Sequence, residues 1–419
     1  MKYIDLFAGA GGLSEGFVRE GFVPVAHVEM DEAACFSLKT RIAYYHFLNS
    51  GKFDTYADYL KGNITRAQLY KGVPEELIRS VINLPIGNDN NDKIHHAISQ
   101  QPGSSDIDLI IGGPPCQAYS VVGRARSANA MKGDPRNYLY VQYAGYLEKY
   151  NPKIFVFENV LGLKSAKEGL YLRNMEKMFS KKGYNMRLAA VEANDFGVLQ
   201  NRKRVIILGW HRDLNVNIPV LEDIRIKSPY TVDAVFADLP FLNAGEGTDK
   251  FQTYTKTGSK YLTDTGIRKD LNILTQHVAR PHTEQDKEIY RIAVNKWNNA
   301  SQRLNYNDLP ERLKTHQNTK SFFDRFKVVA QDLKYSQTVV AHIAKDGHYY
   351  IHPDIEQNRS ITVREAARLQ SFPDDYYFEG VKEQGARTAA FRQIGNAVPP
   401  LMAQKIANAL KGILQPPQS

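Results

Sequence analysis

Residues 3–12 read YIDLFAGAGG, a short apolar run that ends in a cluster of glycines. An apolar run of this length predicts a buried β-strand, and glycines directly after it predict a tight turn into a helix. In such a turn the backbone comes close to a ligand, and the free N–H groups of the next helix point towards it. The stretch therefore predicts the opening strand, turn and helix of an α/β fold, with a ligand at the turn.

Further apolar runs repeat this pattern along the first half of the chain. They lie at residues 23–28, 108–113, 154–158 and 204–208, with helical patterns such as 139–150 between them. Continuous apolar strands that alternate with helices indicate a parallel sheet covered on both faces. The expected fold class is therefore α/β, with a doubly wound, mostly parallel sheet.

The alternation stops after about residue 227. Residues 227–355 are polar and aromatic with loop-like tracts, and a helical segment at 362–371 and an apolar helix at 400–410 follow. This change of pattern predicts a second, smaller domain inserted before the chain returns to the first. We expect a catalytic domain at 1–226, a second domain with its supporting motif at 227–384, and a C-terminal segment at 385–419 that completes the catalytic domain.

Bulk composition narrows the class of protein. Two cysteines in 419 residues, Cys35 and Cys116, exclude a disulfide framework and a cysteine-rich zinc site, so no metal is expected. No stretch approaches the roughly 18 apolar residues that span a bilayer, and the N-terminus is too acidic for a signal peptide. We therefore expect a cytoplasmic protein. The formal net charge of +9 is compatible with a polyanionic partner.

The glycine turn and the end of the next strand predict a nucleoside site. Ser14 stands where a strict dinucleotide motif has its last glycine, so the turn alone does not fix the ligand. Glu29 ends the second predicted strand, where a carboxylate can accept hydrogen bonds from both ribose hydroxyls. The ligand is either a dinucleotide or a methyl donor that contains a nucleoside.

The segment GGPPCQAYS, residues 112–120, predicts the chemical centre. It follows a predicted parallel strand, and α/β sheets place ligands at the carboxyl ends of such strands. A single cysteine in an intracellular protein is usually a small buried hydrophobe. Here two prolines fix the backbone just before Cys116, a support that a structural cysteine does not need. Cys116 is therefore predicted to be a nucleophile.

Two further motifs have ordinary interpretations when each is taken alone. Glu158 ends an apolar strand, where a carboxylate needs a partner and could be a helix cap or one half of an ion pair. The sequence QNRKR at residues 200–204 would pass for a solvated basic turn.

In this order, the motifs at 5–17, 114–117, 158–160, 200–204 and 393–400 closely resemble those of the cytosine-5 DNA methyltransferase family, of the bacterial restriction-modification type. The resemblance covers nearly the whole chain except residues 39–105 and the span 227–355. It implies the S-adenosylmethionine-dependent methyltransferase fold, with residues 227–384 as a DNA-recognition domain. The implied activity is site-specific transfer of a methyl group from S-adenosyl-L-methionine to carbon-5 of a cytosine flipped out of duplex DNA.

The resemblance also implies roles for individual residues. Cys116 would add to carbon-6 of cytosine, Glu158 would hold or donate the proton at nitrogen-3, and Arg204 would reach oxygen-2. The residues implied to contact DNA are Gln117, Ser120 and Arg202, the last through a phosphate.

A larger set is implied to bind the methyl donor. Its members are Phe7, Gly9, Gly11, Gly12, Leu13, Glu29, Met30, Pro114, Asn396 and Val398. The motif at 134–139 would pack near the donor, and the motif at 364–373 would support the recognition domain. The family often has an acidic residue after its third strand that binds the adenine amino group. Here Asn63, Asn88 and Asp89 are all candidates, and Ala397 replaces a common serine.

Other functions account for fewer of these residues. A tRNA cytosine-5 methyltransferase carries similar motifs and is the alternative. A nicotinamide-dependent oxidoreductase would explain the glycine turn and Glu29 but not residues 114–116, and an inactive DNA-binding protein would not need both Cys116 and Glu158. The expected partner is double-stranded DNA, with a separately acting restriction endonuclease as a further candidate and no membrane. We expect a monomer in the cytoplasm, associated with the nucleoid.

Overall fold

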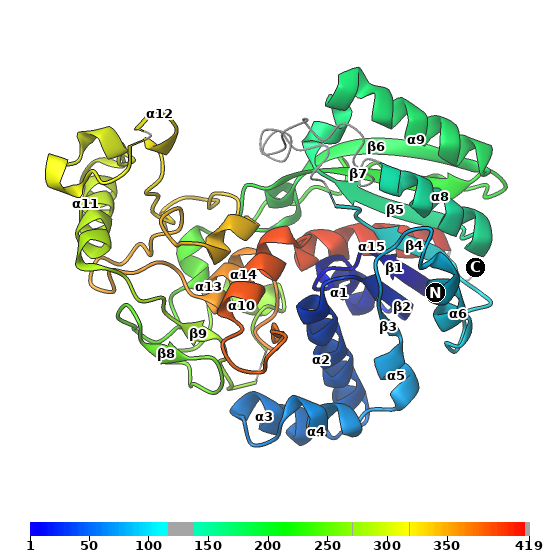
Figure 1. Ribbon diagram of the computed structural model, residues 1–419, viewed down its shortest axis with the longest axis horizontal. Helices are drawn as coiled ribbons and strands as arrows, with labels where there is room; N and C mark the ends of the chain where they lie inside the picture. Colours follow the sequence, from blue (N-terminus) through cyan, green and yellow to red (C-terminus); the bar gives the residue numbers. More distant parts are fainter. Residues whose placement is uncertain (116–137, 270, 318, 415–419) are drawn as a thin grey trace.

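The computed structural model describes residues 1–115, 138–269, 271–317 and 319–414, and within them one large sheet organises the chain (Figure 1). Its strand order is β3-β2-β1-β4-β5-β7-β6. Neighbouring strands from β3 to β5 are parallel, whereas β7 runs antiparallel to both β5 and β6. The strands are β1 (Lys2–Leu6), β2 (Val23–Glu29), β3 (Val81–Asn83), β4 (Leu109–Gly112), β5 (Ile154–Asn159), β6 (Tyr184–Glu192) and β7 (Lys203–His211). The predicted mostly parallel sheet is confirmed.

Helices cover both faces of this sheet, which is why its central strands are apolar throughout. On one face Ile110 and Phe155 pack with α6 (Asn91–Ser99), α8 (Leu139–Tyr150) and α9 (Leu170–Lys181). On the other face Leu109 and Val156 pack with α1 (Gly12–Arg19) and α15 (Pro400–Leu414). Burying both faces removes the central strands from water, the arrangement expected of a doubly wound sheet.

Four helices between β2 and β3 extend away from the sheet at the lower edge of Figure 1. They are α2 (Glu32–Asn49), α3 (Phe53–Lys61), α4 (Arg66–Lys71) and α5 (Glu75–Arg79). The Asp31 side chain caps α2 by accepting a hydrogen bond from the Ala34 amide at 3.0 Å, and Thr65 and Gln68 form a capping box on α4. Tyrosines from α2 and α3 fill a separate core.

The chain from residue 227 onwards has short elements and long connections. They are η6 (Val232–Val235), β8 (Gly247–Thr248), α10 (Lys260–Asp264), β9 (His277–Val278), α11 (Glu284–Ala300), η7 (Tyr306–Asp308), η8 (Glu311–Leu313), α12 (Thr319–Phe322), η9 (Ala341–Ala344), α13 (Val363–Leu369) and α14 (Arg387–Asn396). The 3-10 helices η3 (Leu161–Lys164), η4 (Ala166–Gly169) and η5 (Ala193–Phe196) belong to the sheet domain. Helices α11 and α12 stand apart from the sheet and have their own small core (Figure 1).

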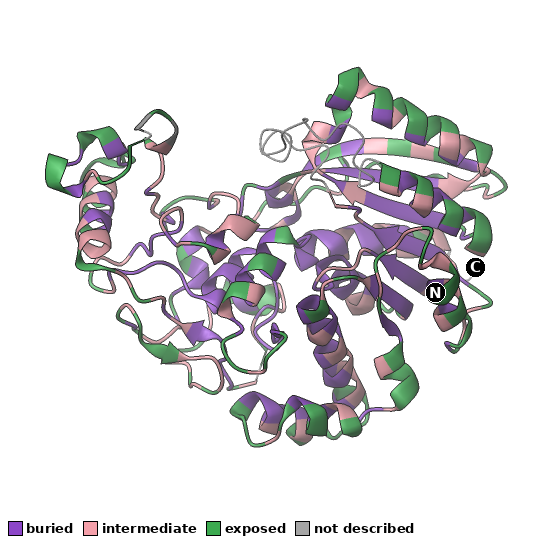
Figure 2. Cartoon of the chain, in the orientation of Figure 1, coloured by how far each residue is buried: buried purple, intermediate pink, exposed green. Residues whose placement is uncertain are grey.

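Helix α13 lies at the base of this second region, and its charged side chains are completely buried (Figure 2). Thr362 and Glu365 form its capping box. Arg368 forms ion pairs with Asp238 at 2.6 Å and with Asp374 at 2.7 Å. A buried charge is tolerated only when it is paired, so these contacts hold segments that are distant in the sequence in one arrangement. The predicted helix at 362–371 is confirmed over Val363–Leu369.

Helix α15 brings the end of the chain back to its beginning. A Cβ at Gly16 of α1 would lie 2.4 Å from the backbone nitrogen of Gln404 in α15, so the two helices pack backbone to backbone. Among the described helices, none combines the length and the apolar character needed to span a bilayer.

Candidate active site

The glycine turn after β1 is built for close approach of backbone to backbone. Gly9 has φ +54°, and a Cβ added to it would meet no atom within 4 Å. A Cβ on Gly12 would lie only 2.3 Å from the carbonyl oxygen of Val398. Only a glycine at position 12 leaves room for this carbonyl group. The motif at residues 393–400 therefore contacts the turn, as the sequence predicted. Leu13 is buried behind the turn, and Phe7, at φ +58°, begins it.

The Glu29 carboxylate lies beside this turn and is held by backbone amides. It accepts hydrogen bonds from the amides of Gly9 at 2.7 Å, Met30 at 2.8 Å and Asp31 at 2.8 Å. Burial raises the pKa of Glu29. A carboxylate offers about four acceptor positions, so three fixed amides leave one position for a ribose hydroxyl rather than the two that were expected.

The surroundings of Glu29 fit a nucleoside ligand. The side chain of Met30 is 65% exposed, although methionine is apolar, and it offers an adaptable apolar surface next to Glu29 in the sequence. Asp5, at the end of β1, is buried, and its Oδ2 has no hydrogen-bond partner among the residues that the structure describes. Burial raises the pKa of Asp5. Asn396 is exposed and Val398 is buried where the last motif meets the turn. Apolar surface, spare acceptors and open space at Gly9 together suit adenosine joined to a polar tail.

Asn83 lies beside Glu29 and Met30 and was not among the residues expected from the sequence. It ends β3, and its Nδ2 donates to the carbonyl oxygens of Glu29 and Met30, both at 3.1 Å. Of the three candidates, Asn63 lies before β3 and donates to Asp58 of α3, whereas Asn88 and Asp89 follow β3 and stay candidates. The sequence offered one signal for Asn83: it is a polar residue directly after the apolar pair Val81 and Ile82.

The described part of the nucleophile loop ends at Pro115, and the predicted residues Cys116, Gln117 and Ser120 lie outside the described residues. What precedes them is fixed against β5. A Cβ on Gly113 would lie 2.7 Å from Oε2 of Glu158, so the loop starts in contact with that carboxylate. The Nδ2 of Asn159 donates to the carbonyl oxygen of Pro114 at 3.1 Å, and Asn159 is buried. Asn159 thus orients the backbone that leads to the thiol.

Glu158 and Arg204 form an ion pair at the same edge of the sheet. The Nε of Arg204 lies 2.7 Å from Oε1 of Glu158, and their side chains are 14% and 13% exposed. The pairing follows from the sheet, because β5 and β7 are antiparallel and place Glu158 opposite Ile206. The structure therefore brings together two of the three predicted catalytic residues, next to the start of the loop that carries the third.

The predicted phosphate contact of Arg202 is wrong in this structure. Arg202 is fully buried, and its guanidinium donates to the carbonyl oxygens of Val339 at 2.8 Å and Gly395 at 3.1 Å. Gln200 is also buried and accepts a hydrogen bond from the Val339 amide at 2.9 Å. Both side chains tie the sheet domain to the second region, so this motif joins the two parts, while Arg204 pairs with Glu158.

Sheet order, glycine turn and acidic β2 end together define an S-adenosylmethionine-dependent methyltransferase. Solved structures share this fold. An Escherichia coli protein described as a prophage-encoded DNA modification methyltransferase aligns with a TM-score of 0.65 and 23% identity, covering 99% of each chain. S. pombe Dnmt2 aligns with a TM-score of 0.51 and 14% identity over 99% of each chain. At these identities the likeness shows the fold alone.

Sequence comparison identifies the family. The model of the C-5 cytosine-specific DNA methylases matches residues 1–59 and 82–412, and the chain belongs to that family. The type II methyltransferase M.Bpa9945I of Bacillus paralicheniformis is 44% identical over 99% of both chains. M.DdeI of Desulfomicrobium norvegicum is 32% identical over 98% of this chain and 88% of its own. The protein is therefore a DNA (cytosine-5-)-methyltransferase that uses S-adenosylmethionine, and the oxidoreductase alternative is excluded.

Proposed function

We propose that this enzyme methylates one cytosine within a specific site of duplex DNA, with Cys116 as covalent nucleophile and with Glu158 and Arg204 holding the base. The observation that carries the proposal is the 2.7 Å pair of Glu158 and Arg204 beside the loop that leads to Cys116. A carboxyl group and a guanidinium this close can contact neighbouring polar atoms of one pyrimidine ring. A base inside a duplex cannot reach them, so it must be flipped out.

In the proposed mechanism the Cys116 thiolate forms a bond to carbon-6 of the cytosine. The ring electrons move to carbon-5, while Glu158 holds a proton at nitrogen-3 and Arg204 donates to oxygen-2. Bound S-adenosylmethionine supplies a methyl group on a positively charged sulfur, which carbon-5 takes up as the sulfur–methyl bond breaks. Loss of the carbon-5 proton to a base then restores the double bond, and the bond from Cys116 to carbon-6 breaks.

The proposed donor site consists of the glycine turn, the end of β2 and the last motif. Glu29 would accept from the ribose, Met30 would lie against the adenine, and Asn83 would stand at the adenine edge. The remaining proposed contacts are Phe7, Gly9, Gly11, Gly12, Leu13, Pro114, Asn396 and Val398.

A covalent trap tests the nucleophile. DNA that carries 5-fluorocytosine should leave the enzyme attached to it in the presence of the methyl donor, because fluorine is not lost as a proton is. The complex should survive denaturing electrophoresis, and Cys116→Ala should abolish it. The matched control is Cys35→Ala, since Cys35 is buried on α2 and should not affect trapping. Trapping that persists in Cys116→Ala would remove the assignment.

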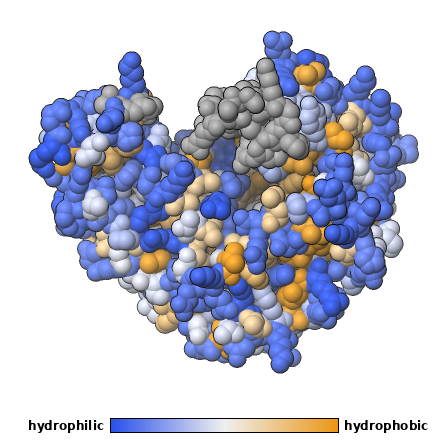
Figure 3. Space-filling view, in the orientation of Figure 1, coloured by the Kyte–Doolittle hydropathy of each residue, from blue (hydrophilic) through white to orange (hydrophobic). Residues whose placement is uncertain are grey.

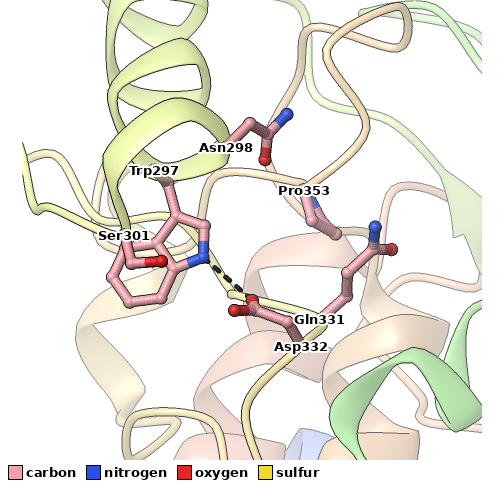
Figure 4. A pocket seen from close by; sticks show the side chains of 6 residues that line it. All are labelled: Trp297, Asn298, Ser301, Gln331, Asp332 and Pro353. Atoms are coloured by element: carbon pink, nitrogen blue, oxygen red, sulfur yellow. Dashed lines mark hydrogen bonds between the residues drawn. The ribbon is translucent and has the colours of Figure 1, made fainter.

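We propose residues 227–384 as the DNA-recognition domain. The surface is hollowed between the α11–α12 region and the sheet domain, and the α11–α12 side of this hollow is mostly hydrophilic (Figure 3). A cavity of about 300 Å³ opens beside α11, where the amides of Asn298 and Gln331 lie at the edge and Trp297 Nε1 donates to Asp332 at 2.9 Å (Figure 4). Side-chain amides can bond both polar atoms of an adenine edge, so Asn298 and Gln331 are candidate readers.

Exchange of a domain segment tests this assignment. Replacing residues 227–355 by the matching span of a relative should move methylation to the relative's sequence, as read by bisulfite sequencing. An active chimera that still methylates the original site would place the reader elsewhere.

We also propose that the enzyme protects host DNA in a restriction-modification system, because relatives over the full length are type II methyltransferases. It would act as a monomer in the cytoplasm, on nucleoid DNA, with a cognate endonuclease that works separately. Host DNA methylated at one site, and resistant to an endonuclease encoded nearby, would support this role. Susceptible DNA from expressing cells would contradict it.

A further inference from the structure

Helices α4 and α5, together with the end of α3, form a segment that the family model does not match. The match to the family stops at residue 59 and resumes at 82, so α4 and α5 lie wholly in the gap and α3 at its edge. This segment nevertheless has a buried core, and that core includes Ile273 and Tyr377 from the proposed recognition region. The segment therefore contacts both parts of the enzyme.

Arg66 of α4 joins three parts of the chain. Its guanidinium donates to the carbonyl oxygens of Gly380 at 2.7 Å and Val381 at 2.8 Å, just before α14. The same group lies 3.7 Å from the ring of Phe36 on α2. Nearby, the buried carboxylate of Glu379 accepts a hydrogen bond from Thr40 at 2.7 Å. These bonds fix residues 379–381 to α2 and α4.

Lys250 makes the contact from the recognition side. It follows β8, and its Nζ lies 4.0 Å from the ring centre of Tyr59 on α3 and 4.5 Å from that of Tyr377. The two rings meet edge to face at 5.6 Å, and the Tyr59 hydroxyl donates to Glu379 at 2.5 Å. Burial lowers the pKa of Lys250. The carboxylates of Glu379, Glu383 and Asp249 favour its charged form, whereas the positive charge of Arg66 disfavours it. Two tyrosine faces around one cation make a specific joint.

We infer that α3 and α4 brace the recognition domain, with Lys250 and Tyr59 as positioning residues that hold it ready for DNA. Domains joined by polar interfaces normally move relative to each other, and fixing them in advance lowers the ordering cost of binding. The brace leaves the reacting atoms untouched, so it affects DNA binding and not the chemical step. The inference rests on the proposed assignment of residues 227–384 to DNA recognition.

Lys250→Met tests the brace, because it keeps the apolar stem and removes the charge. We expect the KM for DNA to rise by about 2- to 30-fold, the equivalent of one cation–π contact. Turnover at saturating DNA and the Kd for S-adenosylmethionine should stay as in the wild type. Lys250→Arg should restore the KM, since it keeps a cation between the rings. The matched control is Lys61→Met. Lys61 is exposed at the end of α3, the helix that carries Tyr59, and its replacement should leave the KM for DNA unchanged.

An unchanged KM for DNA in a folded Lys250→Met enzyme would overturn the brace. So would parallel losses in turnover, donor affinity and melting temperature, because these indicate general destabilisation. Where Lys250→Met does not fold, Tyr59→Leu removes one ring of the joint and must show the same split. Failure of the recognition assignment would appear instead in the domain exchange, whatever Lys250→Met does.

Discussion

Replacing Arg202 by methionine should separate a structural from a DNA-binding role for the basic motif. The guanidinium lies between the sheet domain and the second region, where it donates to the carbonyl oxygens of Val339 and Gly395. Methionine fills much of the same volume but donates nothing. Two buried carbonyl groups would then lose a charged donor.

The size of the effect follows from these two bonds. A buried polar group that loses its partner costs about 1 to 3 kcal/mol. We therefore expect the free energy of unfolding to fall by about 2 to 6 kcal/mol in Arg202→Met. The neighbouring Lys203 is 60% exposed and pairs with Glu192 at the surface, so Lys203→Met should change stability by no more than about 0.5 kcal/mol.

Urea unfolding and DNA binding at several salt concentrations distinguish the two roles. A phosphate contact contributes about 0.9 to the slope of log affinity against log salt, so its loss would lower that slope by nearly one. The buried position of Arg202 predicts an unchanged slope together with a large loss of stability. Wild-type stability with a slope lowered by about 0.9 would refute the structural role.

Four further predictions follow, three from the site and one from His27, a buried histidine of β2. Glu158→Gln should lower turnover by about 10²- to 10⁴-fold with unchanged donor affinity; equal turnover would make this carboxylate structural. Gly12→Ala places a Cβ against a backbone carbonyl, and overpacking of about 1 to 3 kcal/mol should weaken donor binding by calorimetry at least fivefold. Asn159→Ala leaves the Pro114 carbonyl unpaired and should slow single-turnover methylation by about 5- to 150-fold, with DNA affinity retained. Burial lowers the pKa of His27 to about 4, below the value of about 6.5 in the unfolded chain. The unfolded chain therefore takes up a proton first, and the free energy of unfolding falls as the pH is lowered from 6.5 towards 4. His27→Asn should therefore flatten unfolding free energy in that window, and an unaltered profile would contradict the shift.

The strands that the sequence predicted are those buried on both faces, because burial there demands continuous apolar residues. β4 and β5 are of this kind. β3 was missed because it has only three residues between polar segments, and β6 because exposed residues interrupt it at the sheet edge. Helix α8 was predicted with its observed ends, since its buried tyrosines recur at helical spacing.

The site divides along similar lines. Glu158 lies near the end of β5 and Arg204 near the start of β7. These strand ends are neighbours in the sheet, so the proximity of the two residues could be expected from the order of the motifs. Arg202 could not be separated from Arg204 in the same way. The carbonyl groups that bury it come from residues 339 and 395, and nothing local shows that they cover one guanidinium and leave the other at the site. Asn83 was not predicted because the short strand that carries it, β3, was not predicted.

The packing of α1 against α15 has a consequence for how the enzyme is made. One wall of the proposed donor site comes from Gly12 and the facing wall from Val398, which the ribosome adds long afterwards. The pocket therefore cannot form before Val398 has been synthesised, and a chain that stops short of that residue should have no methylating activity.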